Sequence, residues 1–180
     1  MPTLNMLNTK WVILQDEQTK QPVAQPNMAA LGNAWFVNEV VIAADANKEM
    51  ELITNFDPAK QVVVHKDFES YVSGLQLNDT GSTVQLTGFD NKKLDYEVNV
   101  ANGTQFLVFS EIYYAPKYQA WKAYIDGKEV EHIRVNYLLR GLKVPAGKHS
   151  ITFKFEPETY YMGSKIDLGF SILLLLGAAI

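Results

Sequence analysis

Aromatic, arginine and asparagine side chains gather in one stretch of the chain and supply the residue types that bind sugars. The candidates for a glycan-binding site are Tyr113, Tyr114, Tyr118, Trp121, Arg134, Asn136 and Arg140. Aromatic rings beside a polar rim stack on sugar rings, and arginine or asparagine hydrogen-bonds the hydroxyls. Arg134, Asn136 and Arg140 alternate with other residues in one predicted strand. We therefore expect these three on one face, near the aromatic cluster.

A purely structural role for the same residues is the alternative. In that role Trp121 fills the core, and the tyrosines anchor a loop or touch lipid headgroups. An exposed groove lined by Tyr113, Tyr114 and Arg140 would distinguish sugar binding from this structural role.

Other chemistries find little support in the sequence. There is no cysteine, which excludes thiol catalysis and thiolate metal sites. His65, His132 and His149 lack metal-ligand spacing, and no glycine-rich phosphate-binding loop occurs. We predict no metal, no cofactor and no catalytic residue. A hydrolase that uses a carboxylate pair such as Asp95 and Glu97, which share a strand face, remains a separate hypothesis.

The overall composition limits the class of partner. The 180 residues are 47% hydrophobic, and the formal net charge is −4. Disorder is therefore not expected. Without a basic stripe, nucleic acid is not an expected partner.

The elements that would position the candidates are mostly short strands. Val84 and Leu86 share a face, residues 94–100 alternate between apolar and polar, and residues 106–109 are apolar on both faces. Asp126-Gly127 predicts a tight hairpin turn. These patterns favour a mainly β (α+β) fold, an antiparallel, jelly-roll-like β-sandwich.

Around the predicted sandwich, other features differ in kind. We expect strands at 9–14 and 34–42, a proline-containing loop at 21–31, and a helix that Asp45 caps and Pro58 ends. Met50, Ile53 and Phe56 recur at helical spacing in it. The predicted organisation is an N-terminal α/β segment (1–57), a β-sandwich (58–157), a joint (158–167) and an apolar helix (168–180).

The apolar helix is the sequence's only indication of a membrane. From Leu168 to Ile180 no residue is charged, and Leu173 to Leu176 are four consecutive leucines. A spanning helix needs about 20 such residues, so we interpret this run as the start of a truncated transmembrane helix. Tyr160 and Tyr161 would suit an interfacial aromatic belt. A buried C-terminal core helix is the alternative.

Several motifs extend through the second half of the chain. They are Leu107-Val108-Phe109-Ser110-Glu111-Ile112-Tyr113-Tyr114, Trp121-Lys122-Ala123-Tyr124-Ile125-Asp126-Gly127-Lys128, Arg134-Val135-Asn136-Tyr137-Leu138-Leu139-Arg140, Val144-Pro145-Ala146-Gly147-Lys148-His149, Phe153-Lys154-Phe155-Glu156-Pro157 and Gly163. Together they resemble the C-terminal soluble part of the bacterial YfhO family, particularly its Bacteroidetes-type members. Residues 5–10 and 31–37 also resemble it. Residues 115–120 depart from it, because the family has a shorter turn before the tryptophan.

The resemblance implies a polytopic membrane protein related to GT-C glycosyltransferases, which transfer sugar from a polyprenyl-phosphate donor. The catalytic acids of such enzymes lie in an early external loop that this chain does not contain. The resemblance therefore implies an accessory, non-catalytic domain on the extracytoplasmic side of the cytoplasmic membrane. Its expected partners are the membrane and, in addition, an envelope glycan or a polyprenyl-phosphate sugar. An independent carbohydrate-binding module is the alternative function.

Overall fold

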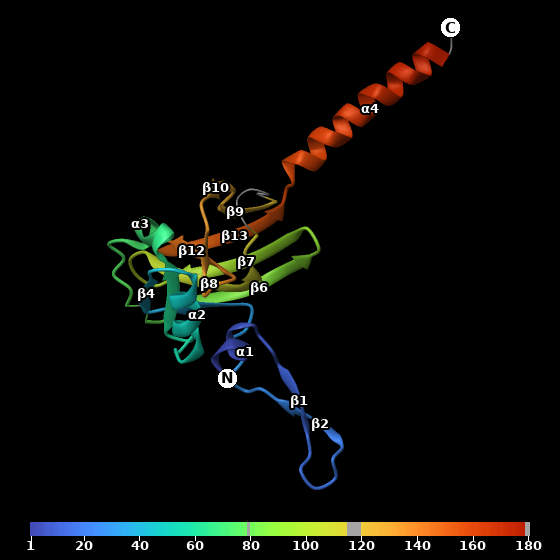
Figure 1. Ribbon diagram of the computed structural model, residues 1–180. Coiled ribbons are helices and arrows are strands. Elements are labelled where there is room, and N and C mark those ends of the chain that lie inside the picture. The colour runs from blue at the N-terminus through green and yellow to red at the C-terminus, as the bar shows by residue number, and fades with distance from the viewer. Residues whose placement is uncertain (79, 115–119, 179–180) are drawn as a thin grey trace.

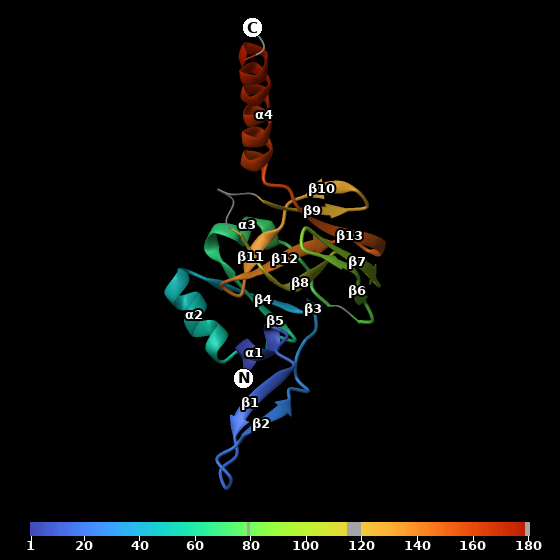
Figure 2. The same ribbon diagram turned by 90° about the vertical axis from the view of Figure 1, so that its right-hand side faces the viewer.

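A computed structural model describes residues 1–78, 80–114 and 120–178 of the chain. Two packed β-sheets form the body (Figure 1). A two-stranded hairpin and a long C-terminal helix project from opposite ends of that body, as Figures 1 and 2 both show.

The first sheet contains five strands in the order β10-β9-β13-β7-β6, and every neighbouring pair is antiparallel. Its strands are β6 (Thr83–Asp90), β7 (Lys93–Val100), β9 (Trp121–Ile125), β10 (Lys128–Val130) and β13 (Gly147–Phe155). Burial alternates residue by residue along β7, as the apolar–polar alternation predicts. One face of this sheet is therefore buried.

The second sheet contains six strands in the order β3-β8-β12-β11-β5-β4. They are β3 (Ala34–Val37), β4 (Glu39–Ala43), β5 (Gln61–His65), β8 (Gln105–Ile112), β11 (Ile133–Val135) and β12 (Leu139–Val144). β4 and β5 run parallel, and the other neighbours are antiparallel. The mainly β, sandwich-like fold class is confirmed.

Two hydrophobic cores lie on the two faces of the six-stranded sheet. Leu107 and Phe109 of β8 point into the core between the sheets. Phe106 and Val108 point into the opposite core, which α1 (Pro2–Met6), α2 (Ala46–Thr54) and α3 (Glu69–Val72) cover with the 3₁₀ helix η1 (Lys66–Phe68). β8 is therefore buried on both faces, as its continuous apolar run predicts.

Local signals of the sequence are confirmed where short-range chemistry decides the conformation. Asp45 caps α2, because its carboxylate accepts a hydrogen bond from Lys48 N–H at 2.9 Å. Asp126 and Gly127 have φ values of 51° and 79° and join β9 to β10. The buried face of α2 is Glu49 and Ile53, whereas Met50 is exposed.

The N-terminal third differs from its predicted elements. The strand expected at 34–42 breaks at Asn38, so that β3 pairs with β8 while β4 pairs with β5. The expected loop at 21–31 contains β2 (Pro22–Pro26), which pairs with β1 (Trp11–Gln15).

The prolines of β2 are tolerated because they lie on the free edge of the hairpin. The bonds Asn27 N–H to Lys10 O and Asp16 N–H to Gln21 O set which residues face across the pair. Between these two bonds, hydrogen-bonded and non-hydrogen-bonded positions alternate along β2. Pro22 and Pro26 fall at non-hydrogen-bonded positions, where the backbone nitrogen points away from β1. The two prolines therefore remove no hydrogen bond between the strands.

Helix α4 (Glu158–Ala178) begins ten residues before the predicted apolar helix. Its described side chains are exposed, so the alternative of a buried core helix is wrong for the described residues. Among the described residues, no helix is both long enough and apolar enough to cross a membrane. The transmembrane helix that we expected is thus not found among the described residues.

Candidate functional site

Aromatic and polar side chains from η1, β9, β10 and the segments after β8 and β10 line a cavity of about 610 Å³ at one end of the sandwich. Its lining residues are Phe68, Tyr113, Tyr114, Trp121, Lys122, Ala123, Glu129, Val130, Glu131 and His132. Such a volume is within the range of small-molecule sites. Phe155 pairs with Trp121, and α4 begins three residues later. The aromatic pocket therefore lies at the end from which α4 projects (Figures 1 and 2).

The end of β8 positions the two tyrosines. Tyr113 N–H donates to Leu138 O at 2.7 Å, which ties this segment to the start of β12. The ring of Tyr113 makes edge contacts with Phe68 at 6.4 Å and with His132 at 5.4 Å between centroids. Tyr114, the next residue, is 59% exposed. Tyr113 is therefore held in place, while the ring of Tyr114 is accessible to a ligand.

Trp121 is supported from behind by a buried arginine. The Arg140 guanidinium lies 4.6 Å from the Trp121 ring and 5.1 Å from the Phe153 ring, and Arg140 is 2% exposed. Its Nε donates to Ile112 O at 3.0 Å. The Trp121 ring also contacts Phe155 at 5.4 Å. Arg140 thus makes a cation–π contact with Trp121 and is not among the lining residues of the pocket.

Burial sets the protonation of the groups around Arg140. Burial lowers the pKa of Arg140 to about 10, so the guanidinium stays charged at neutral pH. Burial and the charge of Arg140 together lower the pKa of His132 to about 4. Burial also raises the pKa of Glu111, although Arg140 opposes that rise. His132 is therefore neutral at pH 7.

The rim of the pocket carries more acid than base. Lys122 Nζ lies 3.8 Å from a Glu129 carboxylate oxygen. Glu131 is exposed, and its backbone oxygen accepts a hydrogen bond from Tyr71 Oη at 2.7 Å. The Tyr71 contact fixes the chain between β10 and β11.

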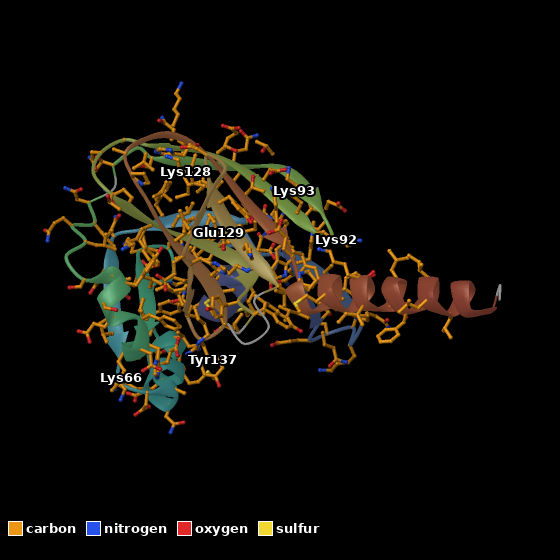
Figure 3. All side chains as sticks on the ribbon, turned by 90° about the horizontal axis from the view of Figure 1, so that it is seen from above. Lys66, Lys92, Lys93, Lys128, Glu129 and Tyr137 are labelled. Atoms are coloured by element: carbon orange, nitrogen blue, oxygen red, sulfur yellow. The ribbon has the colours of Figure 1, made fainter. Side chains whose placement is uncertain are left out.

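Two predicted site residues lie elsewhere. Arg134 pairs with Glu49 of α2 at 3.1 Å, and buried Asn136 accepts from Val63 N–H at 2.8 Å through its side-chain oxygen. Figure 3 shows Tyr137, the next residue, on the side where α2 lies. Both side chains thus hold the β11–β12 turn against the sheet and α2.

The expectation that Arg134, Asn136 and Arg140 share one strand is wrong. β11 ends at Val135 and β12 begins at Leu139. Between them Asn136 and Tyr137 adopt φ values of 47° and 72°, so the chain reverses direction. Tyr118 lies outside the described residues.

In the carboxylate pair considered for hydrolysis, Asp95 is engaged by neighbouring side chains. Asp95 binds Lys93 Nζ at 2.8 Å and accepts from Thr152 Oγ1 at 2.8 Å. Glu97 is exposed on the same strand. Within the described ranges, no three histidine or acidic side chains cluster as metal ligands would.

Sequence reasoning indicated three of the ten described lining residues of the pocket, Tyr113, Tyr114 and Trp121, and missed the other seven. The Asp126-Gly127 turn sets the hairpin register, in which Val130 lies opposite Ala123. Because Glu129 and Glu131 flank Val130 in the sequence, this register brings both within reach of Lys122. The turn motif could therefore have indicated these two glutamates. Phe68 arrives from a distant segment, and no local pattern indicates it.

Comparison with known proteins gives one match. Residues 73–167 match the model of the family described as "Bacterial membrane protein YfhO". No curated protein and no solved structure matches the chain. The match begins just after α3 and covers most of the sandwich, every described pocket residue except Phe68, and the first half of α4. The chain therefore belongs to the YfhO family of bacterial membrane proteins.

Proposed function

We propose that this chain is an accessory, non-catalytic domain of a membrane protein of the glycosyltransferase type. In this proposal it lies on the extracytoplasmic side of the cytoplasmic membrane and binds the glycan that accepts sugar from a polyprenyl-phosphate donor. The GT-C relationship and the side of the membrane rest on the sequence resemblance. Family membership supports the membrane context.

One observation carries the proposed binding role, the convergence of Tyr113, Tyr114 and Trp121 on the aromatic pocket. These residues come from the end of β8 and the start of β9 and meet beside carboxylates and a neutral histidine. Aromatic faces pack against the C–H faces of sugar rings, and carboxylates accept hydrogen bonds from hydroxyls. This combination suits a carbohydrate better than an apolar ligand.

The division of the chain supports the same proposal. Residues 1–57 supply α2 and two strands of the six-stranded sheet, β3 and β4, and residues 58–157 contain the pocket. Residues 158–167 would form the joint, and the uncharged run from Leu168 onward would contact the bilayer. Because α4 starts beside Trp121, a glycan in the pocket would lie close to the membrane surface.

The test is deletion of this domain from the full-length membrane protein, followed by analysis of the envelope glycans. We expect loss or shortening of the transferred sugar, whereas unchanged glycans would remove any role in transfer. The same loss with Trp121→Ala or Tyr114→Ala in the full-length protein would assign the effect to the aromatic pocket. Trp11→Ala is the matched control, because Trp11 is 62% exposed on the distant hairpin.

An independent carbohydrate-binding module is the second candidate, and the same pocket favours it. A glycan array with the isolated chain separates the two. Tight, Trp121-dependent binding by the chain alone, together with unchanged envelope glycans after deletion, would favour the module.

A further inference from the structure

We propose, on the basis of the glycan-binding function above, that the aromatic pocket accepts an uncharged sugar ring and rejects anionic sugars, including those linked to phosphate. The pocket would then hold the acceptor glycan and not the polyprenyl-phosphate donor. The inference rests on the charges that line the pocket.

The basic side chain of the pocket is already compensated. Lys122 is the one lysine or arginine among the described lining residues, and Glu129 lies 3.8 Å from its ammonium group. Figure 3 shows Glu129 on the body of the sandwich, well separated from Tyr137. Phosphate sites ordinarily present arginine forks or several lysines. With Glu131 added, the described lining residues carry a net negative charge.

The histidine of the pocket adds no positive charge. Burial and Arg140 lower the pKa of His132 to about 4, so its ring is neutral at physiological pH. A neutral imidazole has one donor and one acceptor nitrogen. This pair matches a sugar hydroxyl, which also donates and accepts, and gives no ionic attraction to a phosphate.

The buried arginine does not reverse this balance. Arg140 lies behind the Trp121 ring at 4.6 Å and is 2% exposed. Its charge interacts with Glu111, and its Nε donates to Ile112 O. Arg140 is not among the residues that line the pocket, and its burial shields the guanidinium from a ligand there. The acidic rim is therefore the charge that a ligand meets first.

The aromatic rings of the pocket limit the shape of the ligand, and the acidic rim limits its charge. Tyr114 is 59% exposed, while Tyr113 is fixed by its contacts with Phe68 and His132. Trp121 adds a third ring on the β9 side. A flat pyranose ring can lie against these surfaces with its hydroxyls toward Glu131 and His132.

The experiment uses the whole 180-residue chain in detergent on an array of paired glycans. Each neutral hexose oligosaccharide is printed beside the same oligosaccharide carrying a uronic acid, a sulfate or a phosphate. We expect neutral members to be retained at least about tenfold more strongly than their anionic partners. Retention should fall with Tyr114→Ala, which removes an exposed ring and spares the core.

A charge-reversal variant tests the physical cause. Glu131→Lys should lower the ratio of neutral to anionic glycan retained by about tenfold. Glu17→Lys, in the exposed loop of the distant hairpin, should leave the preference unchanged. Tyr114-dependent retention of anionic glycans by the unmodified chain would overturn the inference but leave glycan binding intact. Binding of no glycan, or binding that ignores Tyr114 and Trp121, would overturn the proposed function itself.

Discussion

At the scale of single residues, two arginines that face each other across two strands have different roles. Arg134 lies opposite Arg140 in the β11–β12 register. Arg134 reaches Glu49 on α2, whereas Arg140 turns under Trp121 in the sandwich. A bulge between Leu139 and Arg140 shifts the pairing at this point. One arginine therefore serves the scaffold, and the other orients a pocket residue.

Glu49 is the buried centre of the contacts between α2 and the β11–β12 turn. Its carboxylate accepts from Tyr137 N–H at 2.7 Å and pairs with Arg134. Glu49→Ala leaves both groups without this partner, so we expect a loss of about 2 kcal/mol in the free energy of unfolding, measured with urea. Glu51→Ala on the same helix removes a carboxylate that is 70% exposed and should cost at most about 0.5 kcal/mol. Equal losses would contradict this role.

His132 predicts acid sensitivity of the folded state. Its pKa is lowered from 6.5 to about 4 by burial and by Arg140, so the unfolded chain takes up a proton first as the pH falls. The stability that depends on neutral His132 is complete above pH 6.5. It decreases toward pH 4 by up to about 1.4 kcal/mol per pH unit.

Urea unfolding of the wild type and of His132→Gln across this range measures the effect of His132. The carboxylates titrate in both proteins, so the difference in slope isolates the histidine. We expect the variant to lose less stability between pH 6.5 and 4. Parallel curves would show that His132 can accept a proton in the folded protein.

At the scale of elements, the sequence correctly predicted the features that neighbouring residues determine. The Asp45 cap, the Asp126-Gly127 turn and the alternation along β7 depend on neighbouring residues. The break at Asn38 depends on two different partner strands, β8 and β5. The same distinction separates Tyr113 and Trp121, which local pattern indicated, from Phe68, which it could not.

The β9–β10 turn should respond to pH in the opposite direction to His132. The hydrogen bond that His149 Nδ1 donates to the Asp126 carboxylate, at 2.7 Å, is the main cause that raises the pKa of His149 above 6.5. The same bond and the Ser150 N–H hold the pKa of Asp126 below 3.8. The stabilisation is therefore complete below pH 6.5 for His149 and is lost as the pH rises through its folded pKa. For Asp126, it is present above pH 3.8 and is lost as the pH falls through the lowered pKa.

NMR titration of His149 measures the His149–Asp126 interaction directly. Asp126→Asn keeps a residue that accepts positive φ at the turn but removes the charge. We expect the pKa of His149 to return toward 6.5 in this variant while the pKa of His132 stays low. An unchanged His149 pKa would mean that Asp126 does not form this pair in solution.

At the scale of the whole molecule, the two ends expose apolar surface that the sandwich does not cover. Trp11 and Ile13 of the hairpin are 62% and 73% exposed, and the described residues of α4 are exposed along the helix. Figure 3 shows Lys92, on the β6–β7 turn, near the start of α4, where a shallow cavity is lined by Lys92, Phe155, Pro157 and Tyr160. The body meets α4 chiefly at this point, so folding and membrane contact should be separable.

A chain that ends at Pro157 tests that separation. No α4 residue whose side chain is described belongs to either hydrophobic core, so we expect the melting temperature to stay within about 2 °C of that of the whole chain. Flotation with phospholipid vesicles should behave differently. Burial of an exposed Leu, Ile or Phe side chain contributes about 1.5–3 kcal/mol, and α4 presents Leu168, Phe170 and Ile172 without cover. The whole chain should therefore float with the vesicles, and the shortened chain should stay in solution.

The opposite outcome would be flotation of the shortened chain that is lost when Trp11→Ala and Ile13→Ala are combined. That outcome would assign the bilayer contact to the hairpin and reverse the orientation proposed for the aromatic pocket.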